Sequence, residues 1–155
     1  MFWYVVATML ASGEIAPARQ LQVELAVAAA MTAATAQSEL RRAPDGLFYV
    51  TGTINGAPVR FLVDTGSTST VLTRDDAMRA GVMPPADAFA ARADTANGPA
   101  RIAWVMLDDL QVGGIKARDM AAAVAPDGLG VSLLGQNWLS QLASLTISGD
   151  RMEFR

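Results

Sequence analysis

The amino-acid sequence predicts an all-β fold, a small closed barrel with one or two short helices. Beyond Gly46, short runs of β-forming residues alternate with turn dipeptides such as Asn-Gly and Gly-Gly. The strands recur at short spacing, which favours a small barrel or sandwich over an alternating α/β sheet. A hydrophobic content of 52% with 17% charged residues is typical of a globular chain with a sizeable core.

The first predicted hairpin joins Leu47–Ile54 to Val59–Val63 through Asn55-Gly56, which is the strongest short hairpin signal in the chain. We expect a further strand over Ser67–Leu72, directly after the hairpin. Glycine-containing turns and loops divide the rest of the chain into shorter runs. These runs predict the strands Phe89–Ala93, Arg101–Leu107, Leu110–Val112, Ile115–Arg118, Met120–Val124, Leu145–Ile147 and Met152–Phe154.

Two short helices are expected between these strands. Thr73 has the position of a capping residue, and the acids Asp75 and Asp76 follow it at the positive end of the helix dipole. Gly81 is placed to end this helix. The second helix is expected to run from about Asn137 to Leu142.

The N-terminal part, residues 1–46, differs in composition from the predicted domain, residues 47–155. Met1–Ala11 is apolar but has only about half of the ~20 residues that a membrane helix needs. Leu25–Ala36 ends in Ala34-Thr35-Ala36, which has the form of a signal-peptide cleavage site. We expect export or membrane anchoring; the alternative is an Ala-rich amphipathic helix over Leu21–Gln37. Arg41–Gly46 is expected to be a linker.

Composition narrows the chemistry that this chain can perform. It contains no His and no Cys, which excludes Ser-His-Asp and Cys-His nucleophile systems, zinc fingers and Cys-ligated clusters. A net charge of −3 provides no basic field, so we expect no nucleic-acid partner. An enzyme with this composition depends on carboxylates, hydroxyls, backbone groups, arginines or its single lysine, Lys116.

The segment with the clearest chemical signal is Asp64-Thr65-Gly66-Ser67, which directly follows an apolar strand. A carboxyl buried there needs hydrogen bonds, and Gly66 allows a backbone N–H to approach it closely. Ser67 is expected to donate to the outer carboxylate oxygen, and Thr65 to bond inward across an interface. A hydrogen-bonded acid in apolar surroundings is suited to acid–base catalysis. The alternative is an ordinary turn after a strand.

Other candidate groups are expected to be structural. The acid pairs Asp75-Asp76 and Asp108-Asp109 are interpreted as solvated caps and turns rather than metal ligands. Lys116 is expected on a solvated strand face instead of in a Ser-Lys dyad. Trp104 and Trp138 are expected in the core.

Over about Leu47–Arg155 the sequence resembles the retropepsin-like aspartic proteases, particularly the single-domain bacterial members. Four segments occur in the right order. Asp64-Thr65-Gly66-Ser67 is similar to the catalytic loop, and Asn55-Gly56 to the hairpin before it. The segment Thr95-Ala96-Asn97-Gly98 is similar to the flap hairpin. The fourth segment, which resembles the structure that buttresses the catalytic loop, is Ser132-Leu133-Leu134-Gly135 with Trp138-Leu139.

The resemblance implies a polypeptide substrate, a retropepsin-like barrel, no cofactor and no metal. It implies catalytic roles for Asp64, Thr65 and Gly66, and substrate binding by Ser67 and by Thr95, Ala96, Asn97 and Gly98. Because the chain has one Asp-Thr-Gly and the reaction needs two carboxylates, we expect a symmetric homodimer with the two Asp64 side chains adjacent. The expected location is the bacterial cell envelope, either periplasmic, exported or anchored in the inner membrane.

Two alternatives remain open at this point. One is a catalytically silent dimeric β-barrel that binds peptides or serves as an adaptor, since strand addition would suit either protein. The other is a structural, membrane-anchored protein in which Asp64 is an ordinary turn residue. The terminal strand Met152–Arg155 is expected to join a sheet of the dimer, because so short an edge strand gains from pairing.

Overall fold

The computed structural model of the 155-residue chain describes residues 20–26, 39–95 and 98–155. The chain divides into two compact units, Met1–Ala33 and Ala34–Arg155. In the first unit, residues 20–26 are helical and exposed. None of the helices in the described ranges is long and apolar enough to cross a membrane. The apolar run Met1–Ala11 and the predicted cleavage motif Ala34–Ala36 lie outside the described residues.

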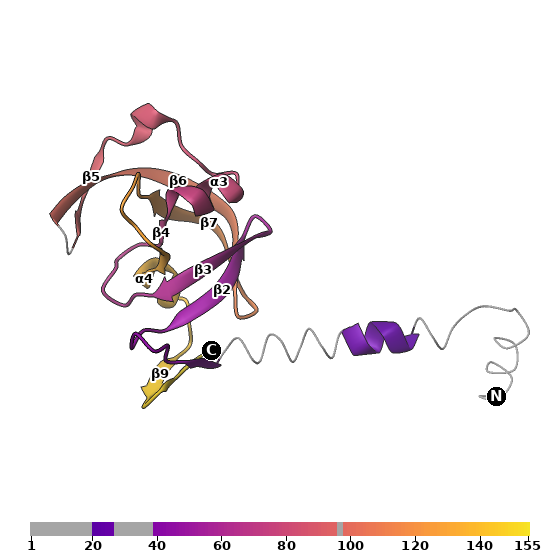
Figure 1. Cartoon of the computed structure of the whole chain (residues 1–155). Helices are drawn as coiled ribbons and strands as arrows, with labels where there is room; N and C mark the ends of the chain where they lie inside the picture. Colours follow the sequence, from indigo (N-terminus) through magenta and orange to yellow (C-terminus); the bar gives the residue numbers. More distant parts are fainter. Residues whose placement is uncertain (1–19, 27–38, 96–97) are drawn as a thin grey trace, which may run out of the picture. The chain divides into compact units, whose positions relative to one another are not determined.

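The second unit is built mostly from β-strands, and the predicted fold class is confirmed (Figure 1). Its three helical segments are α3 (Arg74–Arg79), the 3-10 turn η1 (Ala86–Ala88) and α4 (Gln136–Leu139). Its strands are β1 (Glu39–Arg41), β2 (Tyr49–Ile54), β3 (Ala57–Val63), β4 (Val71–Leu72), β5 (Ala91–Thr95), β6 (Gly98–Val112), β7 (Ile115–Val124), β8 (Ser132–Leu134), β9 (Leu145–Ser148) and β10 (Arg151–Phe154).

Seven of these strands form one sheet that closes on itself. Its order is β2-β3-β8-β4-β7-β6-β5, and an additional pairing of β2 with β6 completes the barrel. β5 pairs only with β6 and so continues the sheet beyond the ring. Closure leaves few free strand edges, as expected for a small barrel.

The strand β8 is the centre of the part that carries the candidate site. It pairs in parallel with β3, placing Phe61 opposite Ser132 and Val63 opposite Leu134, and antiparallel with β4. These two pairings bring the ends of β3, β4 and β8 together. The loop after β3 therefore leaves the barrel next to the start of α4 (Figure 1).

The core of the barrel is formed by buried apolar side chains. Trp138 is fully buried, as predicted, and its ring meets Phe154 edge-on with 6.0 Å between the centroids. Trp104, predicted in the core, lies instead on the outer face of β6 with 54% of its surface exposed. The alternation of β6 places Trp104 and Met106 outward and Leu107 inward.

The second half of the barrel has longer strands than expected. β6 and β7 are continuous, so the predicted breaks at Asp108-Asp109 and at Asp119 are wrong. Asp119 has a positive φ of 49° within β7, yet the register is the same on both sides of it. Leu107 and Leu110 are both buried, because the strands change face at this point. Asp108-Asp109 is thus not a turn.

Two expected element boundaries are also corrected. The predicted strand Ser67–Leu72 is reduced to Val71–Leu72, because residues 65–70 form no strand and include a turn at 65–66 and a bend at 68–69. Residues expected to be a linker are ordered: β1 pairs with β10, and Arg42 bridges Phe48. The folded part therefore begins before Leu47.

The two hairpins at either end of the domain agree with the sequence prediction. β2 and β3 pair around Asn55-Gly56, and β9 and β10 pair around Gly149-Asp150. The terminal strand differs from expectation in one respect. β10 is the middle strand of a three-stranded sheet, β1-β10-β9, and is not an edge.

Candidate active site

Asp64 lies directly after β3, at the point where the chain leaves the sheet. Its backbone N–H donates to the carbonyl of Leu134 at 3.1 Å, which extends the β3–β8 pairing by one residue. The next residues turn sharply, because the N–H of Ser67 donates to the carbonyl of Asp64 at 3.3 Å. Asp64 is partly buried, while Thr65 and Gly66 are exposed.

The Asp64 carboxylate is fixed from within its own loop. The Gly66 N–H donates to Asp64 Oδ1 at 2.9 Å, which closes an Asx turn. A Cβ added to Gly66 would lie 3.3 Å from that same Oδ1, so a side chain at this position would crowd the carboxylate. The close approach of the Gly66 N–H to the Asp64 carboxylate agrees with the prediction from the sequence.

Ser67 and Thr65 do not have the expected side-chain contacts within this chain. Ser67 Oγ donates to the carbonyl of Ser69 at 2.7 Å, so the expected bond to the outer carboxylate oxygen is wrong. The interface bond expected of Thr65 involves a second copy and stays a prediction. The Thr65 carbonyl accepts a hydrogen bond from Gln136 Nε2 at 2.9 Å.

The first residues of α4 hold the rest of the loop. The backbone N–H groups of Gln136 and Asn137 donate to the carbonyls of Ser67 and Thr68 at 2.8 and 3.1 Å. Asn137 Oδ1 accepts from both the N–H and the hydroxyl of Thr70, at 2.8 and 3.0 Å. The first N–H groups of a helix have no partner within the helix. The backbone N–H groups of Gln136 and Asn137 donate to the loop carbonyls instead. Gln136 and Asn137 were not singled out from the sequence.

The approach of α4 to the loop requires a glycine. A Cβ added to Gly135 would lie 2.3 Å from the Ser69 carbonyl oxygen and 2.9 Å from the Thr70 nitrogen. Real Cβ atoms do not approach backbone atoms this closely. The segment Ser132–Gly135 with Trp138 therefore buttresses the loop by contact, as the resemblance implied.

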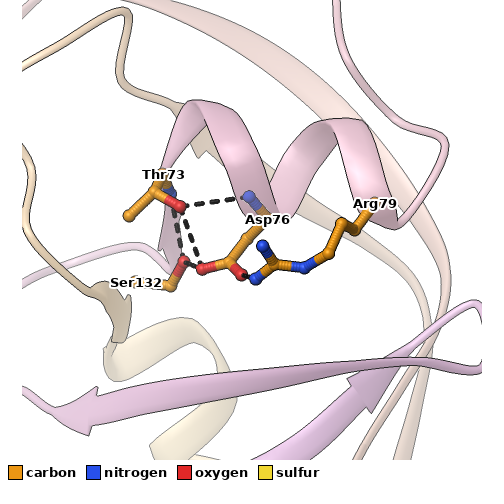
Figure 2. Close-up of polar contacts among 4 residues, drawn as sticks. All are labelled: Thr73, Asp76, Arg79 and Ser132. Atoms are coloured by element: carbon orange, nitrogen blue, oxygen red, sulfur yellow. Dashed lines mark hydrogen bonds and ion pairs between the residues drawn. The ribbon is translucent and has the colours of Figure 1, made fainter.

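A second polar cluster joins α3 to β8 (Figure 2). Asp76, predicted to be solvated, is buried, and its Oδ2 accepts from Ser132 Oγ at 2.5 Å and Thr73 Oγ1 at 2.9 Å. Arg79 pairs with the other oxygen. Thr73 also caps α3, accepting from the Asp76 N–H, as predicted. The described residues contain no group of three or more acids that would hold a metal ion.

The other predicted site residues are placed less completely. Thr95 ends β5 and pairs with Gly98 at the start of β6, so they belong to one hairpin. Ala96 and Asn97 lie outside the described residues. Lys116 is an exposed cross-strand residue, as expected, and its Nζ lies 2.5 Å from Asp109 Oδ2. Asp109 is therefore ion-paired.

The comparisons with known proteins agree with this geometry. The family described as "gag-polyprotein putative aspartyl protease" matches residues 50–141, more than half of the chain. A crystal structure of a retropepsin-like aspartic protease from Rickettsia conorii is similar, with a TM-score of 0.66 and 27% identity. The match covers 75% of this chain and 87% of that one.

Two curated relatives are similar in sequence. An uncharacterized protein in the cobV 5′ region of Sinorhizobium sp. is 38% identical over 117 residues, covering 75% of this chain and 50% of the relative. An uncharacterized protein of Rickettsia prowazekii (strain Madrid E) is 29% identical over 111 residues, covering 72% and 48%. The chain spans about half the length of these relatives. With its closed barrel, its Asp-Thr-Gly loop and this family match, the chain belongs to the retropepsin-like aspartic proteases.

Proposed function

We propose that this chain is an aspartic endopeptidase that hydrolyses polypeptides as a homodimer. The observation that supports this most directly is the placement of Asp64. Its carboxylate is held by the Gly66 N–H and its backbone by Leu134, in a loop whose neighbouring residues are exposed. In the proposed dimer this carboxylate supplies one half of a two-carboxylate site.

In the proposed dimer, the two Asp64 carboxylates face each other across the two-fold axis and share one proton. Like charges about 3 Å apart do not both ionise, so the pair titrates as a unit. The ionised member accepts a proton from water while the water oxygen bonds to the substrate carbonyl carbon. The protonated member donates to the developing oxyanion. The C–N bond then breaks, and the leaving amine takes a proton from the pair.

The surrounding contacts have clear roles in this reaction. Gly66 limits the rotation of the Asp64 carboxyl, and the bonds from Gln136 and Asn137 keep the loop in one conformation. Such preorganisation lowers the cost of reaching the transition state. The hairpin of β5 and β6, with Thr95 and Gly98 at its end, is proposed to cover the bound peptide.

The test is peptide cleavage by the full chain, using an unbiased peptide mixture and mass spectrometry from about pH 4 to about pH 7. Asp64→Asn is expected to lower cleavage by at least about a hundredfold, because the shared proton and the general base are lost. Asp75→Asn, which changes an exposed acid on α3, is the matched control and should cleave like wild type. Equal cleavage by all three proteins would indicate a contaminant. A folded dimer without cleavage would favour the silent peptide-binding module.

The proposed location is the bacterial cell envelope, reached through the N-terminal segment. The apolar composition of residues 1–36 supports this. Membrane fractionation of cells that express the full chain, compared with a chain in which Ala34 and Ala36 are replaced by Arg, tests it. Recovery of the unaltered chain only with the cytosol would contradict the proposal.

A further inference from the structure

Trp104 and Met106 form an exposed apolar pair on β6. The two residues are 54% and 56% exposed. Residues two positions apart on a strand share a face, so both side chains lie on the outer face of the sheet. Contiguous exposed apolar side chains are typical of interaction sites. This pair is therefore a candidate binding surface.

The strand register connects Trp104 to the candidate active site. Leu62 of β3 lies opposite Leu133 of β8, and Leu133 lies opposite Val71 of β4. Val71 lies opposite Ala123 of β7, which in turn lies opposite Trp104. Residues that are paired in register share a face of the sheet. These five residues therefore form one row across the outer face, which we call the apolar row.

The apolar row begins beside the candidate catalytic carboxylate, because Asp64 follows Leu62 by two residues. Leu62, Leu133 and Val71 are all partly exposed, so a ligand can contact the row on its first three strands. Neighbouring strands lie about 4.8 Å apart, which makes the path from Leu62 to Trp104 about 19 Å long. A ligand that reaches from Asp64 to Trp104 is therefore larger than a single amino acid.

The Trp104 ring is open, unlike the aromatic ring at the other end of the row. Tyr49 lies opposite Leu62 and so shares the same face. The Arg60 guanidinium carbon lies 4.0 Å from the centroid of the Tyr49 ring, and the Tyr49 hydroxyl donates to Asp45. Within the ranges that the structure describes, no aromatic ring or guanidinium is stacked on Trp104. The Trp104 ring is therefore available to a ligand.

We propose that Trp104 determines substrate specificity by binding a large apolar side chain, aromatic or long aliphatic, of the substrate peptide. The closed barrel curves, and the two side chains reach toward each other, so the peptide itself spans less than the full path. About four residues of extended peptide, at about 3.3 Å each, then separate the scissile bond from the residue that contacts Trp104. This proposal rests on the proposed protease and names a feature of its substrates.

The proposed homodimer doubles this requirement. The two-fold axis that relates the Asp64 side chains also relates the two copies of Trp104. A peptide that crosses the axis extends toward one Trp104 with the residues before the scissile bond, and toward the other with the residues after it. The preferred substrates therefore have a large apolar residue about four positions from the scissile bond on both sides.

Cleavage of the unbiased peptide mixture by variants of the full chain tests this specificity. With Trp104→Ala, initial cleavage rates should fall about tenfold for peptides with large apolar residues at these positions. Rates for peptides with small or polar residues there should change less than about twofold. Trp104→Phe should retain most of the preference, because it keeps an aromatic ring. Met78→Ala is the matched control, since Met78 is 52% exposed on α3 and is not in the apolar row.

Tryptophan fluorescence tests the contact without catalysis. The chain has three tryptophans, and Trp138 is fully buried, so in an Asp64→Asn, Trp3→Phe chain acrylamide quenching reports Trp104. Asp64→Asn keeps the peptide intact. The probes are two short peptides with the central sequence Val-Ala-Leu-Leu-Ala-Val, flanked directly on both sides by Phe in one and by Ser in the other. The Phe peptide should lower the quenching of Trp104 at least about twofold, and the Ser peptide should not.

The results separate this proposal from the proposed function. A cleavage profile of Trp104→Ala identical to that of wild type would overturn the role of Trp104, as would equal quenching with the two peptides. Asp64-dependent cleavage in that case would leave the protease standing. Protection of Trp104 by the Phe peptide alone, without any cleavage by the wild-type chain, would support the Trp104 contact and overturn the endopeptidase.

Discussion

Asn137 Oδ1 accepts hydrogen bonds from both the backbone N–H and the hydroxyl of Thr70, a residue 67 positions earlier in the chain. Thr70 is fully buried at the end of the candidate catalytic loop. Asn137 Nδ2 donates in turn to the Ala121 carbonyl of β7 at 2.7 Å. One amide thus joins α4, the loop after β3 and β7.

Replacing this amide should destabilise the domain and the loop together. Asn137→Ala leaves two buried donors of Thr70 without an acceptor, and we expect a loss of about 2–3 kcal/mol in the free energy of unfolding. Gln141→Ala is the control, because the side chain of the exposed Gln141 donates only to the Asn137 carbonyl and to a sulfur atom. Gln141→Ala should change the free energy of unfolding by no more than about 0.5 kcal/mol. Urea denaturation measures both, and equal losses would contradict the role given to Asn137.

The contact between Gly135 and the loop predicts a steric effect. Gly135→Ala places a Cβ 2.3 Å from the Ser69 oxygen, so the loop or α4 must move. The backbone of Gly135 (φ −94°, ψ −178°) is open to alanine, so the penalty is steric and about 1–3 kcal/mol. Peptide cleavage should fall as well, since the displaced loop carries Asp64.

Gly130→Ala is the matched control for this substitution. A Cβ at Gly130 meets no atom within 4 Å, and this glycine lacks a positive φ. Alanine there should leave the unfolding free energy unchanged or raise it slightly, because it restricts the unfolded chain. Thermal unfolding that shifts equally in the two variants would show that crowding at Ser69 is not the cause.

Because the Asp76 carboxylate is buried (Figure 2), we expect the two adjacent acids of α3 to differ in their contribution to stability. Asp76→Ala leaves the hydroxyls of Ser132 and Thr73 without their acceptor, and we expect a loss of about 2–3 kcal/mol. Asp75→Ala changes an exposed residue in the same turn and should cost less than about 1 kcal/mol. Arg79→Met removes the cation from a carboxylate that is only 8% exposed, so it should also be destabilising, though less than Asp76→Ala because the Arg79 side chain is itself 58% exposed. Chemical denaturation measures the free energy of unfolding of each variant. If Asp76→Ala were as stable as Asp75→Ala, the structural role given to Asp76 would be refuted.

The sequence predicted those features that depend on local chemistry. The Asn55-Gly56 hairpin, the Thr73 cap and the turn at Asp64 each follow from a few adjacent residues. The family resemblance added the order of the segments and the buttress at Gly135. These are the parts of the fold in which local preference and tertiary structure agree.

The features that the sequence did not predict depend on distant contacts. Asn is a common residue at the start of a helix, and nothing in the sequence near Asn137 indicates a bond to Thr70. Asp108-Asp109 has the composition of a turn, but the long pairing of β6 with β7 carries the chain through it. Asp76 is buried only because β8 places Ser132 against α3. Tertiary pairing overrides local preference at each of these positions.

The hydrogen bond between Tyr49 and Asp45 predicts a measurable shift in the titration of the Asp45 carboxyl. Tyr49 Oη donates to Asp45 Oδ2 at 2.7 Å, and the Leu47 N–H donates to Oδ1 at 3.0 Å. The Tyr49 hydrogen bond is the main reason that the pKa of Asp45 is below its usual value, and the Leu47 bond adds to it. The same hydrogen bond raises the pKa of the Tyr49 hydroxyl above its usual value. Both shifts favour the pair of ionised Asp45 and neutral Tyr49.

The direction of the pH effect follows from these shifts. Because the pKa of Asp45 is lower in the folded state, its contribution to stability is present above the unfolded pKa and is lost as the pH falls through the folded pKa. Tyr49→Phe removes the main donor, so the pKa of Asp45 should rise toward its usual value. Arg60→Met removes only the weakest of the causes and should change the Asp45 pKa much less. Carboxyl chemical shifts measured by NMR across the acid range give the pKa directly. An Asp45 titration identical in Tyr49→Phe and in wild type would show that the hydroxyl does not stabilise the carboxylate, and that the turn from Asp45 to Tyr49 is held by its backbone alone.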